Sequence, residues 1–205
     1  MEATLYYIHD PMCSWCWGFS PTWQQIRTQL PAELPVVYLL GGLAPDTDAP
    51  MPLEMQAKLQ QAWHTISQRL GTRFNFDFWT LCHPRRSTYP ACRAVISAQQ
   101  QDGSAAMIIA IQHAYYLDAK NPSDDTTLVE LAKDLGLDAE RFAQALNDPA
   151  TQHELERQIG QGKMLGAQGF PSLVYQTRQD SPLLINYDYL DPEVTLAQIN
   201  RLLSQ

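Results

Sequence analysis

Two cysteines separated by two residues, Cys13 and Cys16, stand near the N-terminus of the chain. They follow a short apolar run at residues 5–8 and precede a stretch with a helical pattern. A thiol at a helix start lies beside unpaired backbone N–H groups and the positive end of the helix dipole. Such a position lowers a cysteine pKa from roughly 8.5 to between about 3.5 and 7.5, and the thiolate is the reactive form. We therefore expect a redox couple with Cys13 as nucleophile and Cys16, one turn later, as resolving thiol.

Zinc binding is the main alternative chemistry for this pair, because two thiolates at this spacing form half of a tetrahedral site. The other ligands would have to come from Cys82, His83 or Cys92, whose spacing is not that of a usual zinc knuckle. Aromatic residues around the motif also suit a substrate groove better than a tight metal loop. We expect no metal, and no cofactor beyond the redox-active disulfide itself.

Other reactive side chains have a structural and a functional interpretation. His9 could tune the pKa of the dithiol or shuttle a proton, or it could be an ordinary strand-end histidine with a backbone partner. Asp10 is expected to cap the loop rather than to act in catalysis. Cys82 and Cys92 could form a second redox pair, but free cysteine behaves as a small apolar residue, so we expect structural thiols.

Composition limits the classes of protein. The chain has 205 residues, 45% of them hydrophobic, which is enough for one substantial core or for a core and a subdomain. A net charge of −8 argues against nucleic-acid binding, which needs clustered lysine and arginine. Four cysteines do not make a disulfide framework, and the N-terminus lacks an export-signal pattern. We expect a cytoplasmic protein that does not bind membranes.

The chain begins and ends with β patterns around a helical middle. Residues 4–9 and 36–40 are predicted as parallel strands, joined by a helix over 13–30. At Pro21 that helix either kinks or gives way to a second helix capped by Ser20. Strands at 172–175 and 183–189 form a predicted hairpin, and Pro192 opens a last helix that runs to residue 203.

Helices are predicted over 53–70, 88–101, 104–119, 126–135, 138–147 and 150–165. Phe74, Phe76 and Phe78 alternate with polar residues, which indicates either a strand or an irregular aromatic loop. The order βαβ, helical block, ββα predicts an α/β, thioredoxin-like fold with an all-helical insertion. We assign residues 1–45 and 165–205 to the thioredoxin-like domain and residues 46–164 to the insertion.

Two motifs carry a family resemblance. The segment 10–18, Asp-Pro-Met-Cys-Ser-Trp-Cys-Trp-Gly, together with Gly-Phe-Pro-Ser at 169–172, resembles the DsbA family of thioredoxin-like oxidoreductases. The resemblance is strongest to its cytoplasmic, FrnE-like branch, and the segment 87–94 resembles the start of that branch's inserted helix. The motifs span about thirty residues, whereas the element order matches over nearly the whole chain.

The resemblance implies further site residues. Pro171 would be cis and would face the dithiol, and the peptide of Phe170 would offer substrate a strand-like docking edge. Met12, Ser14, Trp15 and Phe170 would contact substrate, with Trp15 facing solvent. Related proteins often carry a buried acid in the first strand, but residues 6–8 are Tyr-Tyr-Ile. The proton exchange of Cys16 is therefore left to His9, to a tyrosine or to a water molecule.

The expected substrates are proteins or small molecules that contain disulfides or thiols. A basic cluster, His83, Arg85, Arg86 and Arg93, could bind an acidic thiol such as glutathione, or it could balance nearby carboxylates. A glutathione-dependent isomerase or transferase is the first alternative, because the chain distantly resembles kappa-class glutathione transferases and hydroxychromene-carboxylate isomerases. Those proteins carry a serine in place of Cys13 and need no resolving thiol. A non-enzymatic, redox-sensing binding module is the second alternative.

Overall fold

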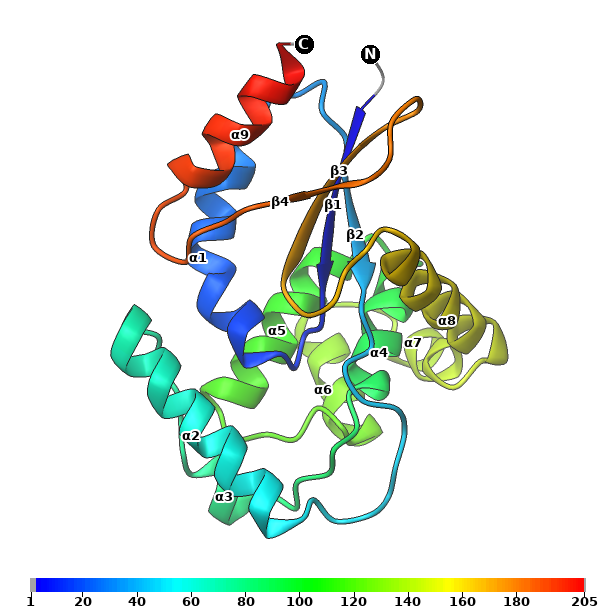
Figure 1. Cartoon of the computed structure of the whole chain (residues 1–205). Coiled ribbons are helices and arrows are strands. Elements are labelled where there is room, and N and C mark those ends of the chain that lie inside the picture. Colours follow the sequence, from blue (N-terminus) through cyan, green and yellow to red (C-terminus); the bar gives the residue numbers. More distant parts are fainter. Residues whose placement is uncertain (1–2, 205) are drawn as a thin grey trace.

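The computed structural model describes residues 3–204 and folds them into one mixed sheet surrounded by helices (Figure 1). The strands of this sheet are β1 (Ala3–His9), β2 (Val36–Leu40), β3 (Ser172–Thr177) and β4 (Leu183–Ile185), in the spatial order β2-β1-β3-β4. Strand β1 pairs parallel with β2 and antiparallel with β3, and β4 pairs antiparallel with β3. The predicted βαβ and ββ units are therefore joined through the central strand β1.

The alternation of side chains along β1 gives the sheet two different faces. Leu5 and Tyr7 point into an aromatic core beneath α1 (Ser14–Gln29) and α9 (Glu193–Leu203). Ile8 points to the other face, where Gly162 of α8 (Pro149–Met164) lies directly against it. A Cβ at position 162 would lie 3.3 Å from Cγ2 of Ile8, a tight contact that glycine avoids at this helix–sheet packing point.

Helix α1 runs without interruption through Pro21, so the alternative of a second helix capped by Ser20 is not realised. Proline has no N–H to donate to the carbonyl four residues earlier, which here belongs to Trp17. The hydroxyl of Ser20 donates to that carbonyl at 2.8 Å. Ser20 thus supplies the missing hydrogen bond from inside the helix instead of capping a new one.

The helices between β2 and β3 form a second core below the sheet in Figure 1. Besides α8 they are α2 (Leu53–Leu70), α3 (Phe78–Leu81), α4 (Tyr89–Gln99), α5 (Ser104–Tyr116), α6 (Asp125–Asp134) and α7 (Ala139–Leu146). Trp63, Met107 and Leu128 are fully buried there. The predicted helical insertion is confirmed as an element order, while the exact domain boundaries stay a prediction.

The structure decides between two alternatives at residues 74–78 and corrects one strand boundary. Phe74 and Phe76 are not in a strand; their rings pack 5.0 and 5.7 Å from the ring of Trp63, within an irregular loop. Strand β4 ends at Ile185 rather than at residue 189. Its predicted continuation bends away because Tyr187 and Tyr189 pack on Phe19 of α1, at 4.8 and 5.7 Å.

Helix α8 also hydrogen-bonds to the outer edge of the sheet. The side-chain oxygen of Gln158 accepts the backbone N–H of Leu40 in β2 at 2.9 Å. Gln158 is only 7% exposed, so this bond replaces one that water would otherwise make. No helix within residues 3–204 is long and apolar enough to cross a membrane.

We expect Gln158→Leu to lower the free energy of unfolding by about 1–3 kcal/mol, because the buried Leu40 N–H would lose its acceptor. Urea denaturation of the purified chain measures this change. Gln161→Leu is the matched control on the same helix: its partner is the largely exposed Arg157, so we expect a loss within about 0.5 kcal/mol. Equal losses in the two variants would contradict the role of Gln158.

Candidate active site

The two thiols lie where the chain passes from β1 into α1. Cys13 is the N-cap residue of α1, with an extended backbone, and its carbonyl accepts the N–H of Trp17 at 3.0 Å. The N–H of Cys13 donates to the carbonyl of Asp10 at 3.0 Å and closes the turn between strand and helix. The sequence predicted this placement of Cys13 at the helix start, where the unpaired N–H groups favour a negative charge.

Cys13 and Cys16 are both reduced and both buried, with exposed fractions of 7% and 0%. The Sγ of Cys13 lies 3.5 Å from the carbonyl oxygen of Phe170, which comes from a loop more than 150 residues away in sequence. The peptide bond between Phe170 and Pro171 is cis. The candidate nucleophile therefore lies against the loop that carries Pro171, which we call the proline loop.

Cys16 lies beneath Cys13, on the inner side of α1. Burial raises the pKa of its thiol well above the ordinary value, and the hydrogen bond with Cys13 and the charge of Cys13 raise it further. A hydrogen bond with the backbone of Asp10 lowers that pKa, whereas the Asp10 carboxylate raises it by charge repulsion. Cys16 is thus a buried, protonated thiol next to a buried acid.

Asp10 is the residue whose importance the sequence did not indicate. The expected loop-capping role is present, since its carboxylate accepts the N–H groups of Met12 at 2.8 Å and Leu43 at 2.7 Å. The same group also accepts the hydroxyl of Thr88 at 2.7 Å, and the thiol of Cys92 lies 3.5 Å away. Burial raises the pKa of Asp10, and these hydrogen bonds offset the rise only in part.

A buried acid therefore lies beside the resolving thiol, directly after β1 instead of within it. Sequence reasoning looked for it among residues 6–8 and interpreted Asp10 only as a local cap. Its long-range partners Leu43 and Thr88 are not readable from spacing. The usable signal was its position immediately before Pro11 and the dithiol.

Packing fixes the loop that carries Pro171. The ring of Phe170 lies against Gly41, so closely that any side chain at position 41 would overlap it. On the other side, the Tyr187 hydroxyl donates to the carbonyl of Pro171 at 2.9 Å. Gly41 follows β2 directly.

A cavity of about 520 Å³ opens over Cys13; we call it the dithiol cavity. The predicted substrate-contacting residues line it, namely Met12, Ser14, Trp15 and Phe170. Trp15 is half-buried rather than fully solvent-facing, because its ring packs 5.1 Å from that of Tyr189.

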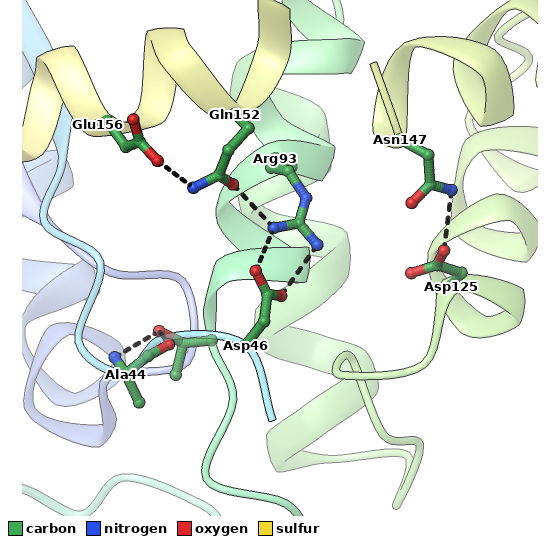
Figure 2. Close-up of polar contacts among 8 residues, drawn as sticks. Ala44, Asp46, Arg93, Asp125, Asn147, Gln152 and Glu156 are labelled. Atoms are coloured by element: carbon green, nitrogen blue, oxygen red, sulfur yellow. Dashed lines mark hydrogen bonds and ion pairs between the residues drawn. The ribbon is translucent and has the colours of Figure 1, made fainter. Parts of the chain in front are cut away.

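Two cations, Arg86 and Lys163, also line the dithiol cavity, and none of the described residues that line it is acidic. The basic cluster predicted from the sequence divides between two roles. Arg93 pairs with both carboxylate oxygens of Asp46, at 2.8 and 3.0 Å, and also donates to Gln152 (Figure 2). Arg85 pairs with Asp124 at 2.6 Å. These two arginines balance carboxylates, whereas Arg86 is directed to the cavity.

The remaining cysteines lie outside the dithiol cavity. Cys92 is fully buried in α4 beside Asp10, and Cys82 donates its thiol to the carbonyl of Ala119 at 3.0 Å. Burial raises the pKa of both thiols. Among residues 3–204, no three His, Cys, Asp or Glu side chains are grouped as ligands of a metal ion.

His9 lies on the opposite face of β1 from the dithiol cavity. Its ring stacks on that of Tyr7 at 5.0 Å, and its Nε2 is buried without a hydrogen-bond partner. Burial lowers the pKa of His9 to about 4, so the imidazole is neutral at pH 7. A charge on His9 that would stabilise a thiolate is therefore absent at this pH.

The β1–α1–β2 unit, the antiparallel β3 and β4, and a Cys-Ser-Trp-Cys helix start facing an X-Pro loop define a thioredoxin-like protein with a helical insertion. A model of the family described as "DSBA-like thioredoxin domain" matches residues 5–188. The chain belongs to this family, as the sequence motifs predicted.

Solved structures of similar proteins agree with this assignment. A "putative protein disulfide isomerase" from Nitrosomonas europaea is 30% identical, with a TM-score of 0.86 over 100% of this chain and 99% of that one. The cytosolic disulfide reductase DsbM from Pseudomonas aeruginosa is 27% identical, with a TM-score of 0.76 over 98% of each chain. A second structure of DsbM contains glutathione.

A curated relative is named as an adapter protein. The ClpXP adapter protein SpxH of Bacillus subtilis is 24% identical over 155 residues, which is 74% of this chain. The match covers 51% of SpxH, so the chain spans about half the length of that relative.

The lowered pKa of His9 predicts a pH-dependent stability. In the unfolded chain the pKa is about 6.5. At pH values between about 6.5 and about 4, His9 is protonated in the unfolded chain but neutral in the folded one. The free energy of unfolding therefore falls as the pH falls through this window. We expect His9 to account for a loss of about 2–3 kcal/mol between pH 7 and pH 4.5.

Urea denaturation at the two pH values tests this, with His9→Phe as the variant, because phenylalanine can keep the stack on Tyr7. The variant should lose less stability than the wild type over this range. His153→Phe is the control, because His153 is exposed on α8 and should leave the pH dependence unchanged. Identical pH dependence in wild type and His9→Phe would contradict the prediction.

Proposed function

We propose that this protein is a thiol–disulfide oxidoreductase in which Cys13 is the nucleophile and Cys16 the resolving thiol. The observation that carries the proposal is the position of Cys13: an N-cap thiol that lines an open cavity, 3.5 Å from the carbonyl of the proline loop, with Cys16 behind it. The cytosolic disulfide reductase DsbM, with its similar fold, supports both the activity class and a cytoplasmic location.

The electron transfer in the proposed chemistry involves only the two thiols and a substrate disulfide. The Cys13 thiolate attacks one substrate sulfur, forms a mixed disulfide and releases the other sulfur as a thiolate, which takes up a proton. Cys16 then loses its proton and attacks the Sγ of Cys13, which releases the second substrate thiol. The substrate disulfide is reduced to two thiols, and Cys13 and Cys16 are oxidised to a disulfide.

Asp10 is our candidate for the proton acceptor of Cys16. Its carboxylate is close enough to raise the pKa of the Cys16 thiol, and burial raises the pKa of the carboxyl itself. A carboxylate of raised basicity, next to a thiol that must deprotonate, is suited to take that proton. In the resting protein burial, the interaction with Cys13 and, to a smaller extent, this negative charge raise the pKa of Cys16, so that Cys13 is the first thiol to react.

We expect Cys16→Ser to accumulate a mixed disulfide at Cys13 after incubation with oxidised glutathione, because the resolving step is removed. Cys13→Ser should accumulate none at Cys16, whose thiol is buried and protonated. Mass spectrometry of the intact protein and of its peptides measures the adduct and its position.

Cys82→Ser is the matched control, because Cys82 is partly exposed and lies outside the dithiol cavity. It should resolve mixed disulfides as the wild type does. Equal trapping at Cys13 and Cys16 would contradict the assigned roles.

We further propose that glutathione, or another acidic thiol, is the small-molecule substrate of the dithiol cavity. The cavity contains two cations and no acid among its described lining residues, and glutathione carries two carboxylates. The glutathione-containing structure of DsbM supports the same ligand chemistry. Reduced glutathione would regenerate the dithiol: two molecules are oxidised to one disulfide while Cys13 and Cys16 take up two electrons and two protons.

We expect Arg86→Gln and Lys163→Gln each to lower the second-order rate constant, with which the reduced protein reacts with oxidised glutathione in a single turnover, by about twofold to fivefold, as loss of one partly exposed charge pair predicts. The neutral disulfide bis(2-hydroxyethyl) disulfide should be reduced at the wild-type rate by both variants. Lys133→Gln on α6 is the control, because Lys133 is exposed and does not line the cavity. A similar loss with both disulfides would show that the cations do not select an acidic substrate.

A second candidate function is that of an adapter, favoured by the similarity to SpxH. The glutathione-dependent isomerase or transferase alternative has less support, because the chain carries cysteine where those proteins have serine. An adapter would need neither thiol for binding its partner, whereas the oxidoreductase needs both.

A further inference from the structure

A second cavity lies on the opposite face of β1 from the dithiol cavity. It has a volume of about 700 Å³ and opens between α1 and β2 on one side and α4 and α5 on the other; we call it the rear cleft. Tyr7 and His9 of β1 line it, whereas their neighbour Ile8 lines the dithiol cavity. The proposed oxidoreductase chemistry uses none of the residues of the rear cleft.

The inner part of the rear cleft contains an unsatisfied polar atom. His9 is 1% exposed, and its Nε2 has no hydrogen-bond partner. Burying such an atom without a partner costs free energy, commonly about 1–3 kcal/mol. Nε2 is shielded from water-sized molecules, so a ligand that displaces a neighbouring side chain and offers a hydrogen-bonding group to Nε2 would recover this cost. A concave cavity of this volume has the size of a small-molecule site, so the occupant is a small molecule.

The mouth of the cleft is apolar and carries a cation. Val37, Tyr38 and Ile109 are exposed by 37%, 41% and 45%, although they line a concave surface. Arg27 of α1, which is exposed, lines the same opening, and none of the described lining residues is Asp or Glu. Mostly apolar cavities of this size with a few placed polar groups are typical of small-molecule sites.

We propose that the rear cleft binds a small amphipathic organic anion. Its apolar body lies between β2 and α5, its acidic group pairs with Arg27, and a polar group meets Nε2 of His9. This ligand class follows from the combination of an apolar wall, one cation and one unsatisfied imidazole nitrogen. The site is distinct from the dithiol cavity, where Arg86 and Lys163 are the cations.

The probe for the test is 1-anilinonaphthalene-8-sulfonate, an aromatic anion whose fluorescence rises in apolar sites. Its neutral analogue N-phenyl-1-naphthylamine has the same rings without the sulfonate. We expect saturable binding of one sulfonate probe per chain. Arg27→Gln should weaken binding of the sulfonate probe by about threefold to fivefold, as expected for an exposed ion pair. Binding of the neutral probe should be unchanged. Arg201→Gln, an exposed arginine on α9, is the control.

Two neighbouring alanines on α5 provide a steric test. Ala105 lines the rear cleft and Ala106 does not, and both are exposed, so phenylalanine at either position leaves the core intact. We expect Ala105→Phe to weaken binding of both probes at least about tenfold by filling the cleft, and Ala106→Phe to leave binding unchanged. Urea denaturation confirms that both variants are folded.

Nuclear magnetic resonance reports whether the probe reaches the inner wall. Saturating the protein with the sulfonate probe should shift the imidazole signals of His9 and leave those of the exposed His153 in place. The proposal is overturned if neither probe binds, if Ala105→Phe binds as the wild type does, or if Arg86→Gln abolishes binding while Arg27→Gln does not. None of these outcomes bears on the thiol chemistry, which the trapping at Cys13 measures separately.

Discussion

The buried carboxylate of Asp10 connects the parts of the molecule that build the dithiol site. Its acceptor bonds reach Met12 in the turn before α1, Leu43 in the loop after β2 and Thr88 before α4. The first two segments adjoin strands of the thioredoxin-like sheet, and the third precedes a helix of the insertion. Burying a carboxylate costs free energy unless donors satisfy its oxygens. The three donors must therefore stay close to Asp10, which fixes the positions of the segments that carry them. The resolving thiol lies within reach of the same negative charge.

Side-chain alternation along one strand explains how a small sheet supports two cavities. Residues next to each other in β1 point to opposite faces, so Ile8 lines the dithiol cavity while Tyr7 and His9 line the rear cleft. The helical insertion packs against both faces, with α8 on one and α4 and α5 near the other. Both cavities are therefore formed where the sheet meets the insertion.

The sequence predicted what is local. Hydrophobic periodicity located nearly every helix and strand, and the spacing of Cys13 and Cys16 after an apolar run located the helix start. The three phenylalanines at 74–78 were ambiguous, because alternation alone does not show that Trp63 lies between them. The different roles within the basic cluster could not be predicted either. They depend on Asp46 and Asp124 lying close in space to Arg93 and Arg85, respectively. Contacts between distant segments have no signature in spacing.

The central position of β1 has a consequence for synthesis on the ribosome. Strand β1 is made first, but its antiparallel neighbour β3 follows only after the whole helical insertion, with Ala3 pairing with Thr177. Until then β1 has one open hydrogen-bonding edge, and such edges pair readily with other chains. Helices depend on contacts between residues close in sequence and form quickly. The insertion can therefore fold before β3 is available to pair with β1. The nascent chain is thus most prone to aggregate before residue 177 has left the ribosome.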